Sequence, residues 1–208
     1  MKQKTKYVIL YYAVIFGYFL LVAGCKYTVS NKSPGDSQIN QTATWSEFGE
    51  LNPSAPKETI QLGQLIGEWD CISLDLKSID ADSFVWYSNR ATWKWEYILG
   101  GHALLNNWWQ EDTSPNPTTR EYFVAGIFIF NPNTKHWEAS VMNSRAKRIS
   151  PKFQLIYKAD QIQMHDGSGK WLVTFFDIHK DSFEWKYEIL TEVEEWKPIS
   201  KISAKRKS

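Results

Sequence analysis

The chain has 208 residues, of which 24 are lysine or arginine and 23 are acidic, giving a formal net charge of +1 at neutral pH. This balance excludes the strongly basic surface that is typical of nucleic-acid-binding proteins, and no nucleic-acid partner is expected. The chain is long enough for one domain with a hydrophobic core, and its 11 tryptophans indicate that this core is aromatic.

The first 24 residues have the pattern of a secretory signal. Three lysines precede an uncharged, mostly apolar run over 7–24, which ends in small residues directly before Cys25. This ending resembles the lipobox of bacterial lipoproteins, and the resemblance implies removal of residues 1–24 and acylation of the Cys25 sulfur. The alternative is an uncleaved membrane anchor, for which the 18 uncharged residues are close to the minimum length.

Either interpretation of this segment predicts that the rest of the chain lies outside the cytoplasm. The lipoprotein resemblance implies a lipid bilayer of the bacterial cell envelope as the partner of acylated Cys25. It also favours the outer membrane, where the organism has one, because Lys26 is not the aspartate that retains enteric-type lipoproteins at the inner membrane.

Residues 25–56 are expected to form a flexible tether, because they are rich in Ser, Asn, Thr, Gln and Pro and show little apolar periodicity. A flexible coil of this length reaches roughly 30 Å. Residues 57–208 are expected to form the single folded domain. Within this domain Cys71 has no disulfide partner once Cys25 is acylated, and we expect Cys71 to be a small buried hydrophobic residue.

The domain begins with a short apolar helix over 57–66, and the pattern then changes to period two. Turn sequences such as Gly100-Gly101 and Asn131-Pro132-Asn133 separate the alternating segments, which indicates sequential hairpins. The expected strands cover 68–76, 91–98, 103–110, 121–130, 135–142, 153–158, 161–165, 170–178, 182–190 and 196–205. The sequence therefore predicts an all-β fold, an up-and-down antiparallel barrel of about 8–10 strands.

Aromatic residues gather on one face of several expected strands. In a closed barrel these faces point inward, where they either fill the interior or leave a cavity for one flat or acyl ligand. Polar groups for such a ligand would come from the asparagine, the tyrosines and the indole N–H groups. The candidate ligand-binding residues are Trp93, Trp95, Tyr97, Asn106, Tyr122, Trp185 and Tyr187.

Gly67-Glu68-Trp69 follows the expected helix and opens the first expected strand. A helix, G-x-W and a β-meander in this order resemble the lipocalin-like (calycin) superfamily. In that superfamily the tryptophan packs at the closed end of the barrel, and a basic residue from the last strand lies across its ring. The resemblance implies that Arg206 lies across Trp69 and closes the barrel, a contact worth on the order of 1 kcal/mol.

More closely, the chain resembles a family of uncharacterised bacterial lipocalin-like domains. The segments that carry this resemblance are 95–104, 126–131 and 181–206. The family has no established substrate, cofactor or catalytic residue, so the resemblance implies a fold and no reaction.

No residue pattern indicates catalysis or a metal site, and no cofactor is expected. The four histidines show no metal-ligand spacing, and His179, the nearest match to the haem ligand of some related small barrels, falls in an expected turn. The basic residues of 145–152 are consistent with a solvated loop or an anion-binding rim. Four carboxylates of the expected strands are assigned to outward faces, namely Glu96, Glu138, Glu184 and Glu188. Asp75 and Asp177 would face inward only if the expected register were shifted by one residue.

The sequence therefore predicts an envelope lipoprotein whose barrel binds a small hydrophobic or amphipathic ligand without catalysis. One alternative is an interaction or assembly module with a filled barrel, and a second is a barrel enzyme of the isomerase or esterase type. A ligand-sized cavity would favour the first function and a solid core the second. A buried carboxylate or histidine at the cavity floor would favour the third.

Overall fold

The computed structural model describes residues 47–78, 84–114, 120–150 and 152–208. Cys25, the expected signal segment 1–24 and the expected tether up to residue 46 lie outside the described residues. In the described part of the chain, no helix has the length and apolar character needed to cross a membrane.

The described residues form antiparallel strands preceded by a short helix. The 3-10 turn η1 (Lys57–Thr59) leads into α1 (Ile60–Gly63), and a second 3-10 turn, η2 (Leu99–Gly101), follows β2. The strands are β1 (Gly67–Ser78), β2 (Phe84–Ile98), β3 (Ala103–Glu111), β4 (Glu121–Asn131), β5 (His136–Asn143), β6 (Arg148–Ile149), β7 (Phe153–Lys158), β8 (Gln161–His165), β9 (Trp171–Phe176), β10 (Ser182–Leu190) and β11 (Trp196–Arg206).

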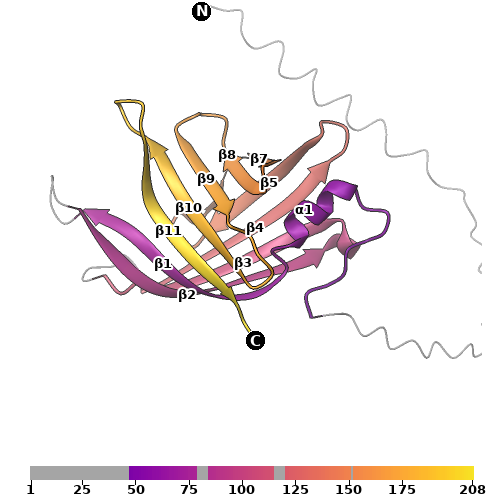
Figure 1. Cartoon of the computed structure of the whole chain (residues 1–208), viewed down its shortest axis with the longest axis horizontal. Coiled ribbons are helices and arrows are strands. Elements are labelled where there is room, and N and C mark those ends of the chain that lie inside the picture. The colour runs from indigo at the N-terminus through magenta and orange to yellow at the C-terminus, as the bar shows by residue number, and fades with distance from the viewer. Residues whose placement is uncertain (1–46, 79–83, 115–119, 151) are drawn as a thin grey trace, which may run out of the picture. The chain divides into compact units, whose positions relative to one another are not determined.

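The sheet closes on itself (Figure 1). Consecutive strands pair as hairpins, β1 pairs with β11, and β4 pairs with β5, so ten strands form a barrel and the two-residue β6 extends the pairing of β5. A closed barrel leaves no unpaired edge that could recruit another strand. The predicted all-β, up-and-down antiparallel barrel is confirmed.

Most expected strands begin and end within a few residues of the observed ones, but β2 begins at Phe84, seven residues before the expected start at 91. Residues 84–90 pair with the second half of β1. The sequence of this segment does not place apolar residues on the inner face and polar residues on the outer face, because Phe84 and Trp86 are exposed whereas Asn89 is buried. The strand is therefore not recognisable from alternation. Lys197 and Lys201 lie over the two exposed rings, which partly compensates for the exposure.

One end of the barrel is closed by α1 and the segment that follows it. Leu62 and Leu65 are fully buried in the core, and the Leu65 carbonyl accepts a 2.8 Å hydrogen bond from Trp69 Nε1. The Arg206 guanidinium lies 4.1 Å from the centre of the Trp69 ring, as the sequence resemblance implied. It also donates to the carbonyls of Ile66 at 2.6 Å, Lys180 at 2.7 Å and Gln64 at 3.4 Å.

The same contact explains the glycine that precedes the tryptophan. Gly67 has a φ of +128°, which side chains rarely adopt, and a Cβ at this position would overlap the Arg206 guanidinium. Gly67, Trp69 and Arg206 therefore depend on one another, although 139 residues separate the first from the last (206 − 67).

Residues 47–56 belong to the expected tether 25–56, yet they pack on the closed end of the barrel. The Phe48 carbonyl accepts a 2.8 Å hydrogen bond from the Tyr97 amide, and Asn52 bonds to Gly100 and Gly101. Lys94 lies over the Phe48 ring. The folded domain therefore begins before the expected boundary at residue 57.

The core of the domain extends from Leu62 to Ala204. The first and last strands of the domain are hydrogen-bonded neighbours, and the other nine strands complete the sheet between them. We therefore expect residues 47–208 to fold as an independent domain.

Substitution of Arg206 should weaken the closed end. Arg206→Ala removes the stacking on Trp69 and three hydrogen bonds to carbonyls, and we expect the free energy of unfolding to fall by about 1–3 kcal/mol in urea titrations. Arg206→Lys should recover only part of this loss, because one ammonium does not reproduce the planar fork. The control is Lys205→Ala at the exposed neighbouring position. An equal effect of the two alanine substitutions would contradict this role of Arg206.

Candidate functional site

The interior of the barrel contains a cavity of about 520 Å³. This volume is within the range of small-molecule sites. Most of its wall is apolar and comes from inward-facing residues of all the long strands. The aromatic residues in the wall are Trp93, Trp108, Tyr122, Phe128, Phe153, Trp171, Phe175, Trp185 and Tyr187.

The aromatic wall is tightly packed around Trp93. Its ring centre lies 5.0 Å from that of Trp108, 5.4 Å from Phe175 and 6.2 Å from Trp185, in tilted and edge-on arrangements. Such offset contacts add to the energy of burial and restrict side-chain movement. The cavity is therefore a preformed space between rigid rings.

Five of the seven candidate residues line this cavity, and two do not. The lining residues are Trp93, Asn106, Tyr122, Trp185 and Tyr187. The side chain of Trp95 is fully buried against Phe128 and Phe175, and it is no part of the wall. The Tyr97 hydroxyl lies so close to Gly63 of α1 that a Cβ there would overlap it. The assignment of Trp95 and Tyr97 to the cavity is wrong, because β2 carries them past its floor towards the closed end.

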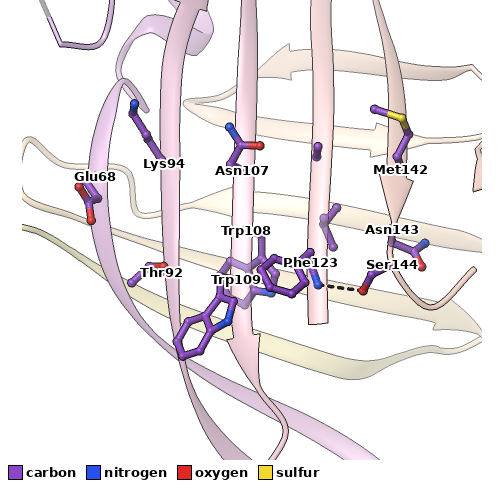
Figure 2. A pocket seen from close by; sticks show the side chains of 12 residues that line it. Glu68, Thr92, Lys94, Asn107, Trp108, Trp109, Phe123, Met142, Asn143 and Ser144 are labelled. Carbon is purple, nitrogen blue, oxygen red and sulfur yellow. Dashed lines mark hydrogen bonds between the residues drawn. The ribbon is translucent and has the colours of Figure 1, made fainter. Parts of the chain in front are cut away.

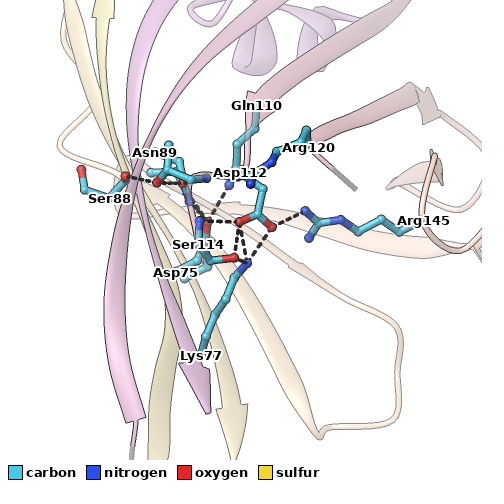
Figure 3. A network of polar contacts seen from close by, with 12 residues as sticks. Asp75, Lys77, Ser88, Asn89, Gln110, Asp112, Ser114, Arg120 and Arg145 are labelled. Carbon is cyan, nitrogen blue, oxygen red and sulfur yellow. Dashed lines mark hydrogen bonds and ion pairs between the residues drawn. The ribbon is translucent and has the colours of Figure 1, made fainter. Parts of the chain in front are cut away.

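The end of the cavity away from α1 is bordered by a cluster of polar residues, which we call the mouth cluster (Figure 3): Asp75, Lys77, Asn89, Gln110, Asp112, Ser114 and Arg145. Asp112 is at its centre with only 1% of its side chain exposed. Its carboxylate accepts from Lys77 Nζ at 2.6 Å and from Arg145 at 2.7 Å. These contacts join β1, the segment after β3 and the segment after β5.

The charges of the mouth cluster keep Asp112 ionised. Burial alone would raise the pKa of Asp112, but hydrogen bonds from Lys77 and Ser114 and the positive charge of Lys77 outweigh burial and hold this pKa well below its ordinary value. The second cation, Arg145, also lies 4.4 Å from the centre of the Tyr122 ring, which is part of the cavity wall.

Asp75 is a carboxylate on the inside of the barrel, where the sequence analysis expected it on the outside. Its oxygens accept hydrogen bonds from four uncharged side chains: Ser73 at 3.0 Å, Asn89 at 3.0 Å, Gln110 at 2.6 Å and Ser200 at 2.7 Å. The expectation was wrong because the polarity of the two faces of β1 is reversed near the mouth: apolar Ile72 and Leu74 are exposed and polar Ser73 is buried. The four donors satisfy Asp75, which favours a structural role over proton transfer.

No histidine or cysteine of the described residues lines the cavity. His102, His136, His165 and His179 are all at least partly exposed, and His179 lies in the turn between β9 and β10. Cys71 is buried, and burial raises the pKa of its thiol to about 12, so it is protonated and a poor nucleophile at neutral pH. Within the described ranges, no group of histidine, cysteine and acidic residues could hold a metal ion.

A second hollow lies on the outer face of β2 to β5 (Figure 2). Trp109 and Phe123 form a cross-strand pair there, and Met142 and Lys94 also contribute. Trp109 Nε1 donates to Glu121 at 3.1 Å. This hollow is an open groove on the barrel surface, whereas the inner cavity is surrounded by strands, so we assign the candidate ligand site to the cavity.

The mouth cluster was not predicted from the sequence, in which Arg145 was expected only as part of a basic rim. Arg145 pairs with Asp112, and Lys152 of the same expected rim pairs with Glu138 at 2.8 Å. The contacts of Asp112 with Lys77 and Arg145 span more than thirty residues of sequence. One signal was available: Asp75 and Lys77 continue the inward period of Trp69, Cys71 and Ser73.

Comparisons with known proteins support the fold. No family model and no curated protein matches the sequence. Among solved structures, Rv2717c from M. tuberculosis is 10% identical with a TM-score of 0.50, over 76% of this chain and 100% of that one. The S-type phycobiliprotein lyase CPES from Guillardia theta is 9% identical with a TM-score of 0.48, over 74% and 98%. At 10% identity the likeness to Rv2717c concerns the fold alone, and it agrees with the closed antiparallel barrel described above.

The stability of the domain should depend on the ionisation of Asp112. Because its pKa is lowered on folding, its carboxylate stabilises the fold above its unfolded pKa, and this contribution is lost as the pH falls towards the lower folded value. Asp112→Asn should therefore lower the free energy of unfolding by roughly 2–3 kcal/mol at pH 7, and by progressively less below pH 4.

Urea unfolding of both proteins at pH 7, 5 and 3 checks this prediction. Glu194→Gln in the exposed turn before β11 is the control and should follow the wild type at every pH. A difference between Asp112→Asn and wild type that stays constant over this range would contradict the prediction.

Proposed function

We propose that this protein is a lipocalin-like binding protein that holds a small hydrophobic or amphipathic ligand in the barrel without chemical conversion. The observation that carries the proposal is the cavity of about 520 Å³ inside a closed, aromatic barrel. Burial of apolar ligand surface provides the driving force, at roughly 25 cal/mol per Å² before the costs of association.

The distribution of polarity in the wall supports an amphipathic ligand. The middle of the wall is aromatic and aliphatic, whereas the mouth cluster supplies a guanidinium, an ammonium and two carboxylates. A ligand with an apolar body and a polar group at the mouth matches both regions. Tyr122 and Tyr187 add hydroxyl groups to the wall, and burial raises the pKa of both, so they remain protonated hydrogen-bond donors at neutral pH.

The two alternative functions have less support. A filled barrel does not agree with the cavity. For an enzyme, the inward carboxylate of Asp75 is the one observation in favour, but it is held by four donors and has no histidine or thiol beside it in the cavity wall.

We also propose that the protein is a bacterial envelope lipoprotein, anchored in the bilayer by acylated Cys25. Support comes from the basic, apolar and small-residue pattern of residues 1–25. An attachment to the membrane surface suits a protein that exchanges an amphipathic molecule with the bilayer.

Filling the cavity should abolish ligand binding. Val141 lines the cavity, and Val141→Phe should weaken binding of the fluorescent probe 1-anilinonaphthalene-8-sulfonate at least tenfold, because the larger ring occupies the site. The matched control is Ile127→Phe, the same type of change on the outer face of the neighbouring strand. Native mass spectrometry with the probe and with dodecanoic acid should show one molecule bound to wild type. A wild-type protein that binds neither compound would refute the proposed function.

Replacement of Cys25 tests the anchor separately. In a bacterial host, the full chain with Cys25→Ala should no longer incorporate labelled fatty acid and should move from the membrane fraction to the soluble fraction or remain unprocessed. Cys71→Ala is the control and should stay acylated. Acylation of the Cys25→Ala protein, detected by mass spectrometry, would contradict the anchor.

A further inference from the structure

Two buried polar groups in the cavity wall have no hydrogen-bond partner. Trp93 and Asn106 both line the cavity, and each residue is only 6% exposed. Neither the Trp93 Nε1–H group nor the Asn106 Oδ1 atom makes a hydrogen bond with any described residue. One is a donor and the other an acceptor.

These groups destabilise the empty barrel. An unpaired polar atom removed from water costs free energy because it loses its hydrogen bonds to water, and most buried polar side chains in folded proteins are paired. Other buried polar groups of the barrel are paired, since Asp75 accepts four hydrogen bonds and Trp69 Nε1 donates to a carbonyl. Of the buried side-chain atoms without a partner in the described residues, these two belong to the cavity wall, whereas Thr59 Oγ1, Trp95 Nε1 and Thr174 Oγ1 lie outside it.

Both groups lie deeper in the barrel than the mouth cluster. On β2, Trp93 is four residues beyond Asn89, and on β3, Asn106 is four residues before Gln110. Four residues correspond to roughly 13 Å along a strand. The intervening inward residues, Ala91 and Trp108, are apolar. The cavity therefore has a polar mouth, an apolar middle and, at its floor, two unpaired polar groups.

The strand opposite Asn106 provides the room for its side chain. Asn106 is paired with Gly126 of β4, where a Cβ would come within 2.8 Å of Asn106 Oδ1 and 2.9 Å of the Phe128 ring. The lack of a side chain at Gly126 therefore leaves space for the Asn106 side chain in a floor that is otherwise aromatic.

We propose that the ligand carries a hydrogen-bonding group at its buried end, with an acceptor for Trp93 Nε1–H and a donor for Asn106 Oδ1, as in a lactam or a similar amide-like heterocycle. This inference rests on the proposed function of the cavity. It selects flat polar-ended molecules over simple acyl chains, whose methyl terminus would leave both groups unpaired at the floor.

A matched pair of probes tests the floor. 2-Quinolone has a lactam N–H and C=O, and naphthalene has the same bicyclic shape without them. Dissociation constants from quenching of tryptophan fluorescence should show that Asn106→Leu weakens 2-quinolone at least tenfold and changes naphthalene less than threefold. Trp93→Phe, which keeps an aromatic ring but removes the N–H, should have the same selective effect and serves if Asn106→Leu does not fold.

The stability of the ligand-free protein provides a second readout, in which Asn106→Leu should not be harmful although it weakens 2-quinolone binding. Asn106→Leu replaces an unpaired polar group by an apolar one of similar size, so its urea midpoint without ligand should equal or exceed that of wild type. The control is Met164→Leu elsewhere in the cavity wall, which should change both probe affinities less than threefold.

The outcomes separate the two proposals. Naphthalene binding with no selective loss of 2-quinolone in either variant would overturn the polar floor but leave the cavity as a ligand site. Failure of the wild type to bind any of the probes, 1-anilinonaphthalene-8-sulfonate included, would overturn both. A selective loss in both variants would support the proposed ligand class.

Discussion

The contact of Arg206 with Trp69 decides which end of the barrel is closed. It joins the last strand to the first, and its hydrogen bonds to the carbonyls of Ile66 and Lys180 fix the segments on either side. With α1 held over this end, apolar side chains can be buried below it without contact with water. The opposite end is then free to carry polar residues around a cavity, and the polarity of the whole interior follows from this one asymmetry.

A cavity lined by so many large rings needs support. Eleven tryptophans would suffice to fill a small barrel, yet Trp95 packs beyond the floor and Trp109 lies on the outer face, so neither occupies the centre. In the cavity wall the rings of Trp108 and Trp185 both contact the Trp93 ring edge-on. The barrel thus maintains an internal space and two unpaired polar groups at a cost in stability, and a gain on ligand binding is the physical reason that we infer for both.

The fold was largely predictable because it depends on local patterns: alternation marks the inward faces and turn sequences mark the hairpins. The closed end followed from the resemblance of G-x-W and a late arginine to lipocalin-like proteins. The candidate site was predictable only in part. Trp93, Trp185 and Tyr187 follow from alternation, but alternation does not say how deep a residue lies, and so it misplaced Trp95. The mouth cluster depends on pairing between distant segments, and the inverted pattern near Asp75 resembles the outside of a strand, so neither could be derived from local sequence.

The packing of residues 47–52 beside Tyr97 and η2 has a consequence for how such a protein can evolve. The chain enters the domain at the closed end, and the mouth cluster borders the cavity at the other end, so the two share no residues. Changes around residues 47–52 need not alter the shape of the cavity, and changes in the mouth cluster need not alter the packing of this segment. The entry of the chain and the lining of the cavity can therefore diverge independently among relatives that keep this barrel.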